Sequence, residues 1–555
     1  MSHPLFEKHR QRLDGALQAS ESRGYWSAFP EVPSGKLYGE NARDDGLSAF
    51  QARLNKTFAL DQPGDGAPLG AESSPFGAPL NIKYPKPSLD ALLSAASRAV
   101  PAWRDAGVEA RVGVCLEILV RLNQRSFELA NAVMHTTGQS FMMSFQAGGP
   151  HAQDRGLEAV GYAYREMTRT PAAAEWSKRV SKTDTVTLRK TFRIVPRGVA
   201  ALVGCSTFPT WNGYPALFAS LATGNAVVVK PHPLAILPLA ITVEVARAAL
   251  RESGFDPNLV TLAPDTPDAP ITKELVTRPA VGIVDYTGSS AFGNWIEQNA
   301  RQAVVFTEKA GVNSTILDSV ADLKAVSGNL AFSLCLYSGQ MCTAPQNIFV
   351  PQDGIDAGGK RIGFDEAAAA IVGAIDWWLS DEKRAAEVLG CIQNEATLRR
   401  VEQAAADGGK TLRASAPVRN EAFPNARTRS PLVLQVSASD REQYMREMFG
   451  PIAYIVATES TRQSVALAAE TARTLGAITC GVYSTRDATL DQADAALADA
   501  GAAVSCNLVG PIYVNQAAAF SDFHVSGANP AGNATLCDGA FVANRFRIVQ
   551  SRRMA

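Results

Sequence analysis

The stretch Gly224-Asn225-Ala226-Val227-Val228-Val229-Lys230-Pro231 is an apolar run that ends in a lysine and a proline. Its valines predict a strand over 226–230, and the lack of alternating polar residues predicts burial on both faces. Comparable apolar runs occur at 199–203, 259–262, 281–286 and 303–307. Helical patterns lie between them, at 214–222, 237–253 and 291–300. This alternation predicts an α/β fold in which helices cover both faces of a parallel sheet.

A second α/β pattern begins after Gly311, and we expect a domain boundary near residue 310. At 555 residues the chain is too long for one ordinary core, which favours two large domains. Strands are predicted at 348–350 and 452–456, and a long helical stretch at 366–395. The first 90 residues mix charged helical stretches with Gly- and Pro-rich loops, and we expect an extension that packs on the main body.

The composition points to a small-molecule partner. The net charge is −1, from 53 basic and 54 acidic residues, so no nucleic acid or anionic membrane is expected as a partner. The amino terminus lacks the apolar core of a secretory signal, which predicts a cytoplasmic protein. The eight cysteines contain no C-x-x-C pair and the six histidines are scattered, so neither a disulfide framework nor a metal site is expected.

One cysteine has a neighbourhood that suggests chemistry. Cys342 lies in Gly339-Gln340-Met341-Cys342-Thr343-Ala344, and Glu308 lies upstream at the end of an apolar run. A thiolate adds to an aldehyde to give a thiohemiacetal, and after a hydride has left, a carboxylate can activate the water that cleaves the thioester. The pair therefore predicts oxidation of an aldehyde to an acid.

The Gly-Gln-x-Cys segment and the glutamate before it resemble the aldehyde dehydrogenase superfamily. The resemblance implies an aldehyde-dehydrogenase-like fold with a Rossmann-type parallel-sheet cofactor domain, a second α/β catalytic domain and a small β oligomerisation element. It implies Cys342 as the nucleophile and Glu308 as the base. We assign 1–90 to the extension, 91–310 to a dinucleotide-binding domain interrupted by oligomerisation strands at 176–195, 311–520 to the catalytic domain, and 521–555 to a carboxy-terminal oligomerisation segment.

The oligomerisation strands are predicted by β-type residues that alternate with charged ones. Thr185 to Ile194 read as part of a strand pair exposed on one face, and Phe541 to Gln550 resemble the superfamily strand that joins subunits. These two segments favour a homodimer or a dimer of dimers.

The resemblance also implies residues that hold a nicotinamide dinucleotide. Lys230 matches the lysine that binds the adenosine ribose. Many NAD-preferring relatives carry a glutamate where this chain has Pro233, and both Lys230 and His232 could meet a 2′-phosphate. We therefore expect NADP, with NAD as the alternative.

Two further segments match the superfamily on the cofactor side. In Tyr286-Thr287-Gly288-Ser289, Gly288 and Ser289 are expected at the pyrophosphate, where a helix begins. In Glu447-Met448-Phe449-Gly450-Pro451, Glu447 is expected at the nicotinamide ribose and Phe449 beside the ring.

The site departs from the family pattern at the oxyanion donor. Thr207 occupies the position of the usual asparagine, and Asn212 is the nearest alternative donor. His524 lies in the region that resembles the substrate mouth, and we interpret it as a satisfied surface histidine.

The extension, Thr207-Phe208-Pro209 and the Glu308 segment resemble the PaaN-type proteins of phenylacetate degradation. This narrower resemblance implies a CoA-linked semialdehyde as the substrate, and we expect a separate protein to open the ring. A CoA-acylating aldehyde dehydrogenase and a reductase of activated acyl groups are alternatives, but Glu308 favours hydrolysis over both. A non-catalytic binding protein on the same scaffold is the third alternative, favoured by Thr207 and Ala310.

Overall fold

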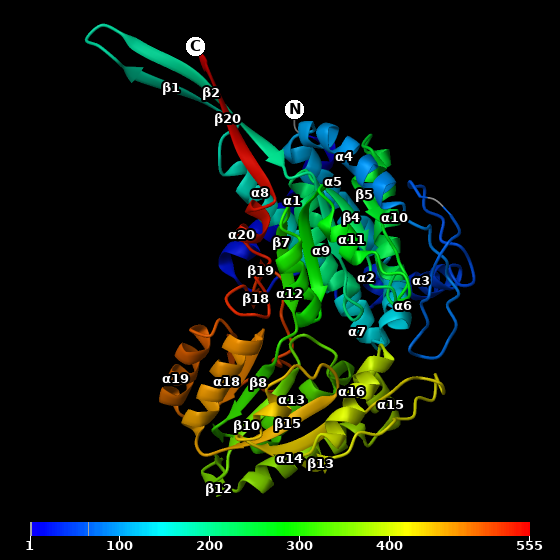
Figure 1. Cartoon of the computed structure of the whole chain (residues 1–555), viewed down its shortest axis with the longest axis vertical. Helices are drawn as coiled ribbons and strands as arrows, with labels where there is room; N and C mark the ends of the chain where they lie inside the picture. The colour runs from blue at the N-terminus through cyan, green and yellow to red at the C-terminus, as the bar shows by residue number, and fades with distance from the viewer. Residues whose placement is uncertain (1–2, 65) are drawn as a thin grey trace.

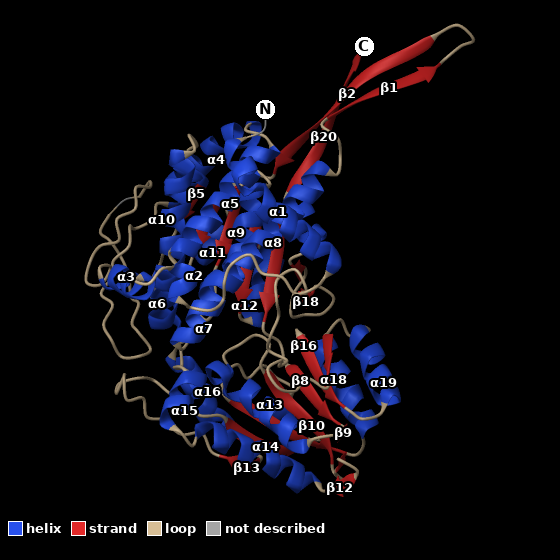
Figure 2. Ribbon diagram, turned by 180° about the vertical axis from the view of Figure 1, so that it is seen from behind, coloured by secondary structure: helices blue, strands red, loops and turns tan. Residues whose placement is uncertain are grey.

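Two α/β units, each built on a mainly parallel sheet, lie one above the other along the long axis of the molecule (Figure 1). The computed structural model describes residues 3–64 and 66–555. A slender β arm projects from the end of the molecule where the two termini lie (Figure 2). The α/β class expected from the sequence is confirmed.

The first sheet has five parallel strands in the order β5-β4-β3-β6-β7. They are β3 (Val199–Val203), β4 (Ala226–Lys230), β5 (Val260–Leu262), β6 (Val281–Gly288) and β7 (Val304–Lys309). Each of them overlaps a predicted apolar run. The strands β4 and β5 lie on one side of β3, and β6 and β7 lie on the other side. This reversal of strand order leaves a crevice outside the carboxyl end of β3, where ligands of such sheets bind. Lys230, Gly288 and Glu308 all lie at this edge of the sheet.

Helices cover both faces of this sheet and join it to the amino-terminal extension. They are α1 (Pro4–Ser22), α2 (Gly35–Tyr38), α3 (Ala42–Gln51), α4 (Leu89–Asp105), α5 (Val108–Gln124), α6 (Ser126–Thr137), α7 (Phe141–Gln146), α8 (Ala152–Thr168), α9 (Pro209–Ala222), α10 (Leu237–Glu252), α11 (Thr272–Thr277) and α12 (Ser290–Asn299). The extension packs on the main body because Phe6, Leu13 and Ala16 of α1 are buried in the same core as the sheet.

The second sheet has seven strands in the order β13-β14-β15-β10-β8-β16-β17, parallel except for β13. They are β8 (Asn313–Leu317), β10 (Pro345–Pro351), β13 (Lys410–Arg413), β14 (Leu432–Ser437), β15 (Ile452–Thr458), β16 (Thr479–Tyr483) and β17 (Ala503–Cys506). Other elements of this half are α13 (Leu323–Cys335), α16 (Glu395–Ala406), α17 (Arg441–Tyr444), α18 (Thr461–Leu475), α19 (Asp487–Ala498), β9 (Ser319–Val320), β11 (Ile355–Ala357) and β12 (Lys360–Ile362).

The single long helical stretch predicted over 366–395 is wrong. Two helices occur there, α14 (Phe364–Leu379) and α15 (Glu382–Leu389). Asp381 starts the second helix because its carboxylate accepts a hydrogen bond from the Arg384 backbone N–H. Gly390 ends it with φ 56°, where a Cβ atom would lie 2.4 Å from the Gly138 carbonyl oxygen.

The arm is a three-stranded antiparallel sheet in the order β1-β2-β20. Its strands are β1 (Ala173–Arg179), β2 (Thr185–Pro196) and β20 (Phe546–Met554), as the alternating pattern predicted. Before β20 the chain forms β18 (His524–Ser526), β19 (Thr535–Leu536) and α20 (Gly539–Ala543). Within the described residues we find no helix with the length and apolarity that crossing a bilayer requires.

Candidate active site

Cys342 lies in a sharply turned loop between α13 and β10. Tyr337 and Ser338 both have φ 50°, and Gly339 has φ 63°. A Cβ atom on Gly339 would lie 2.5 Å from the Gly450 carbonyl oxygen, so glycine is required at this position. The Asn313 side-chain amide donates to the Cys342 carbonyl oxygen at 2.7 Å. The loop is therefore held from the second sheet, and the half-buried thiol faces the space between the two units.

Glu308 is buried near the end of β7, with a hydrogen-bonding group at each carboxylate oxygen. The Asn212 amide nitrogen donates to Oε2 at 2.8 Å, and the His524 Nε2 atom lies 2.8 Å from Oε1. This carboxylate is therefore fixed in orientation by a residue of α9 and a residue of β18.

His524 is a functional candidate whose location the sequence analysis predicted wrongly. It is 2% exposed, so the prediction of a surface histidine is wrong. Its Nε2 atom lies 3.4 Å from Cys342 Sγ, and its ring meets the Trp211 ring edge-on at 4.7 Å between centroids. An isolated antiparallel β-bridge between Glu308 and Gly532 holds the segment around His524 against the end of β7. No local pattern predicts such a long-range pairing.

The electrostatics of the cluster keep the thiol protonated. Desolvation by the surrounding protein, and next the Glu308 carboxylate, raise the pKa of Cys342 well above its ordinary value. Burial likewise raises the pKa of the neighbouring Cys205 thiol to about 11. A proton acceptor beside Cys342 is therefore needed before it can attack, and Glu308 is such a group.

Thr207 and Asn212 differ in how they face this cluster. The Thr207 carbonyl oxygen accepts from the Gln139 amide at 2.7 Å, and its hydroxyl lowers the pKa of Cys205. Asn212, in contrast, lines a cavity together with Cys342 and His524. Asn212 is therefore joined directly to the carboxylate, while Thr207, in the loop after β3, contacts Gln139 and Cys205.

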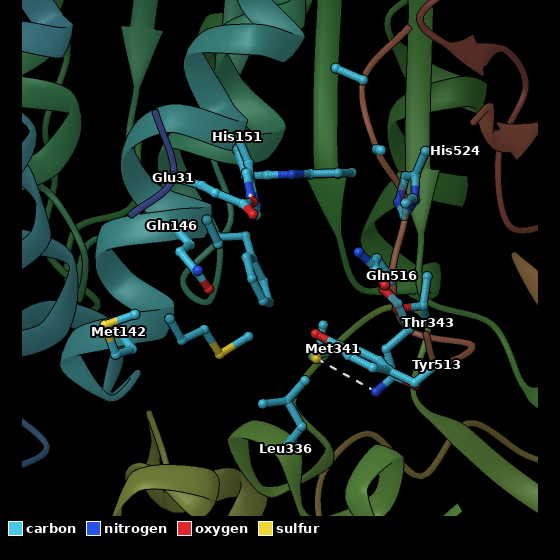
Figure 3. Close-up of a pocket in the computed structure, with 18 of the residues that line it drawn as sticks. Glu31, Met142, Gln146, His151, Leu336, Met341, Thr343, Tyr513, Gln516 and His524 are labelled. Carbon is cyan, nitrogen blue, oxygen red and sulfur yellow. Dashed lines mark hydrogen bonds and ion pairs between the residues drawn. The ribbon is translucent and has the colours of Figure 1, made fainter. Parts of the chain in front are cut away.

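A cavity of about 370 Å³ opens beside Cys342. Its lining includes apolar side chains from both units, namely Met142, Met143, Phe208, Trp211, Phe332 and Tyr513. The amino-terminal extension supplies Tyr25, Trp26 and Glu31 to the same wall, and Figure 3 shows Glu31 beside His151, across the pocket from His524. Sequence reasoning gave the extension no part in the site, because its contact with the cavity depends on tertiary packing.

The segment that carries Glu31 is held by polar contacts to α8 and the turn before it. The Glu31 carboxylate lies 2.7 Å from His151 Nε2. The Ser27 hydroxyl and the Ala28 backbone N–H donate to the Asp154 carboxylate at 2.6 and 3.0 Å. The extension is therefore an anchored wall of the cavity.

Lys230 and His232 lie together at the carboxyl end of β4. The Lys230 ammonium is 2.7 Å from Asp265 Oδ1 and is buried. Burial lowers the pKa of Lys230, although Asp265 opposes this, and burial with the Lys230 charge lowers the pKa of His232 to about 4. His232 is therefore neutral at neutral pH.

The other two cofactor segments predicted from the sequence meet in space. The Ser290 hydroxyl at the start of α12 donates to Glu447 Oε2 at 2.6 Å, directly after Gly288 and Ser289. Phe449 and Cys342 line one small cavity, so the Phe449 segment borders the nucleophile loop. The structure thus brings Glu447 to the helix start that follows Gly288 and Ser289, and Phe449 to the Cys342 loop.

The sequence predicted no metal site, yet three ligand-type side chains converge. One atom each of Glu308, Cys342 and His524 lies within 4.8 Å of the others. We interpret the cluster as acid–base machinery, since it joins a thiol, a carboxylate and an imidazole beside an open cavity.

Comparison with known proteins identifies the family. Residues 83–535 match the model of the aldehyde dehydrogenase family. The chain belongs to this family. It is therefore an oxidoreductase, and the expected superfamily resemblance is confirmed.

Three relatives illustrate the relation. A crystal structure of an NAD-dependent aldehyde dehydrogenase from Burkholderia multivorans is 56% identical, covers 100% of both chains and has a TM-score of 0.99. An N-succinylglutamate 5-semialdehyde dehydrogenase of Paraburkholderia xenovorans is 27% identical over 76% of this chain and 80% of that protein. The aldehyde dehydrogenase LUC3 of Fusarium sp. is 26% identical over 52% of this chain and 59% of its own length. These matches give the family but not a PaaN-type specificity.

Proposed function

We propose that this aldehyde dehydrogenase oxidises an aldehyde to the carboxylic acid, with Cys342 as nucleophile and Glu308 as base, using NAD(P). The observation that carries the proposal is the Glu308 carboxylate, buried and oriented from both oxygens within one cluster with the Cys342 thiol. A hydrolytic enzyme needs such a base for its water, whereas transfer of the acyl group to CoA does not.

In the proposed reaction, each residue of the site has one role or two. Cys342 Sγ bonds to the aldehyde carbon while the thiol proton passes to Glu308. A bound nicotinamide dinucleotide supplies the hydride acceptor. Glu308 releases the thiol proton to solvent, then takes a proton from the water that cleaves the thioester and passes it to the departing thiolate, which releases the acid and restores the thiol. Asn212 and His524 hold Glu308 in place for both proton transfers.

The crevice of the first unit fits a nicotinamide dinucleotide. Gly288 presents bare backbone at the carboxyl end of β6, where a Cβ atom would lie 2.4 Å from the Tyr286 hydroxyl. We assign Lys230 and Glu447 to the two riboses, Gly288 and Ser289 to the pyrophosphate, and Phe449 to the nicotinamide ring.

The sequence favoured NADP over NAD, and two observations reduce the support for that preference. Asp265 balances the Lys230 charge, and His232 is neutral, so less positive charge is available to a 2′-phosphate. The Burkholderia multivorans relative is named NAD-dependent. We therefore propose that NAD is accepted at least as well as NADP.

For the aldehyde, we propose an extended semialdehyde with an apolar body. Aromatic and methionine side chains line the cavity beside Cys342, and the Paraburkholderia xenovorans relative is named for a semialdehyde. The CoA-linked semialdehyde of a PaaN-type enzyme is the finer prediction, and it stays a prediction.

The arm supports a proposed homodimer or dimer of dimers. It projects from the molecule and exposes apolar side chains, with Trp176 37%, Ile548 39% and Val549 54% exposed. Because an unpaired sheet edge with apolar residues favours association, sedimentation as a monomer would contradict this proposal.

The test of the catalytic proposal is the reduction of NAD and of NADP with a panel of semialdehydes in the absence of CoA. We expect NAD(P)H and free acid in equal amounts from the wild type and none from Cys342→Ala. Turnover that requires added CoA would establish the CoA-acylating alternative, and an unchanged rate in Cys342→Ala would refute the nucleophile.

A further inference from the structure

His524 touches both reacting side chains of the site. Its Nε2 atom lies 3.4 Å from Cys342 Sγ and 2.8 Å from Glu308 Oε1, while the Nδ1 atom is buried and has no hydrogen-bond partner among the described residues. One nitrogen is therefore shared between the thiol and the carboxylate, and the other meets nothing.

The unpartnered Nδ1 atom decides the protonation of the ring. A proton on Nδ1 would be a buried donor without an acceptor, which costs about 1–3 kcal/mol. A bare Nδ1 acceptor is better tolerated, and the Glu308 carboxylate needs a donor from Nε2. The geometry thus favours a proton on Nε2, directed at Glu308 and within reach of Cys342 Sγ.

We propose that His524 is a further catalytic residue, a fixed Nε2–H donor that stabilises the Cys342 thiolate at the moment of attack. The S–H bond of Cys342 breaks, an O–H bond forms on Glu308, and the Nε2–H donation shifts from the neutralised carboxyl group to the thiolate. His524 itself neither gains nor loses a proton. The inference rests on Cys342 as the nucleophile.

The charge balance of the pocket supports this role. Desolvation, and next Glu308, raise the pKa of Cys342, so the desolvated thiolate needs a hydrogen-bond donor once its proton has passed to that carboxylate. Trp211 packs edge-on against the imidazole and restricts its ring orientation. Further ionisable side chains lie around the site. Cys205 contacts Asn212, and the Arg155 guanidinium lies 5.1 Å from the Trp211 ring. The cavity that His524 lines is also lined by Glu31, His151, Asp154, Arg384 and Glu387.

The test measures the thiolate without turnover, so its outcome is independent of whether the substrate has been found. The full-length protein is alkylated with iodoacetamide over a pH series, and peptide mass spectrometry reads each cysteine. In His524→Leu we expect the Cys342 midpoint to rise by about one pH unit, which is about tenfold less thiolate at a given pH. The exposed Cys506 is the internal control, and its profile should not move.

A matched variant separates donation from packing. His524→Gln carries an amide nitrogen near the Nε2 position, so we expect a midpoint close to that of the wild type. His524→Asn is too short to reach and should behave like His524→Leu, which keeps the test available if the leucine variant fails to fold. An unchanged midpoint in the leucine or asparagine variant, or an equal shift in the glutamine variant, would overturn the proposal.

Discussion

Replacing Glu308 by glutamine should lower the pH at which the Cys342 thiolate forms, while it slows the later deacylation step. The carboxylate is the second-largest contributor, after desolvation, to the raised pKa of Cys342. Removing that charge lowers the pKa of the thiol, so alkylation of Cys342 should proceed at lower pH than in the wild type. The same substitution removes the base for the deacylating water, and the loss of a positioned general base slows a step by about 10²–10⁴-fold.

The local geometry allows a glutamine at position 308 to fit without disturbing the fold. Asn212 and His524 approach different oxygens of Glu308, so a glutamine carbonyl can accept from one of them while its NH₂ group faces the other. The loss of one charge-assisted hydrogen bond costs about 1.5–3 kcal/mol, which leaves a folded protein. We therefore expect variant protein that still acylates at alkaline pH.

The assay is rapid mixing at alkaline pH, followed by intact mass measurement. We expect a burst of about one reduced cofactor per active site, a slow steady state, and a mass increase equal to the acyl group on Cys342. A slow steady state without a burst and without the acyl adduct would refute the assignment of Glu308 to deacylation. A rise in the alkylation midpoint of Cys342 would refute the electrostatic reasoning.

Two other substitutions test packing around the site. Arg545→Leu removes a fully buried guanidinium bound to Asp285 at 2.6 and 2.8 Å. We expect the free energy of unfolding, measured by denaturant titration, to fall by about 3–5 kcal/mol. Arg547 is exposed, so Arg547→Ala should change the free energy of unfolding little. Equal effects in the two variants would contradict this account. Glu31→Gln weakens a half-exposed contact worth about 1 kcal/mol or less, so KM for the aldehyde should rise about 2–5-fold with kcat unchanged. The hydrogen bond with His151 lowers the pKa of Glu31, so the contact is intact above the ordinary carboxyl pKa and is lost as the pH falls through the lowered pKa of Glu31. The KM of the variant should therefore equal that of the wild type at acidic pH. A difference in KM that persists there would argue against the ion pair.

The sheet of the first unit was predictable because its strands are buried on both faces. The runs 199–203 and 226–230 coincide with β3 and β4, since only a central parallel strand needs such continuous apolar sequence. The break between α14 and α15 was missed because one capping aspartate, Asp381, outweighs a continuous helical periodicity. Local capping and backbone turns are weaker signals in a sequence than burial.

In the candidate site, too, residues in local sequence patterns were predictable and residues placed by long-range contacts were not. Cys342 and Glu308 lie in recognisable local segments, and the structure brings their side chains into one cluster. His524 was misassigned because its burial depends on a bridge between Glu308 and Gly532, far apart in sequence. The direct contact of Asn212 with Glu308 could be suspected only from its nearness to Thr207, since α9 alone determines which side chain points inward.

The anchored wall formed by Tyr25 to Glu31 lies outside residues 83–535, the part of the chain that matches the family. One wall of the cavity thus lies outside the family match, while Cys342, Glu308 and His524 lie within it. Mutations in the extension can change which aldehydes enter while leaving the thiol, the carboxylate and the imidazole untouched. The extension therefore offers positions at which aldehyde selectivity can change without a substitution at the reacting groups.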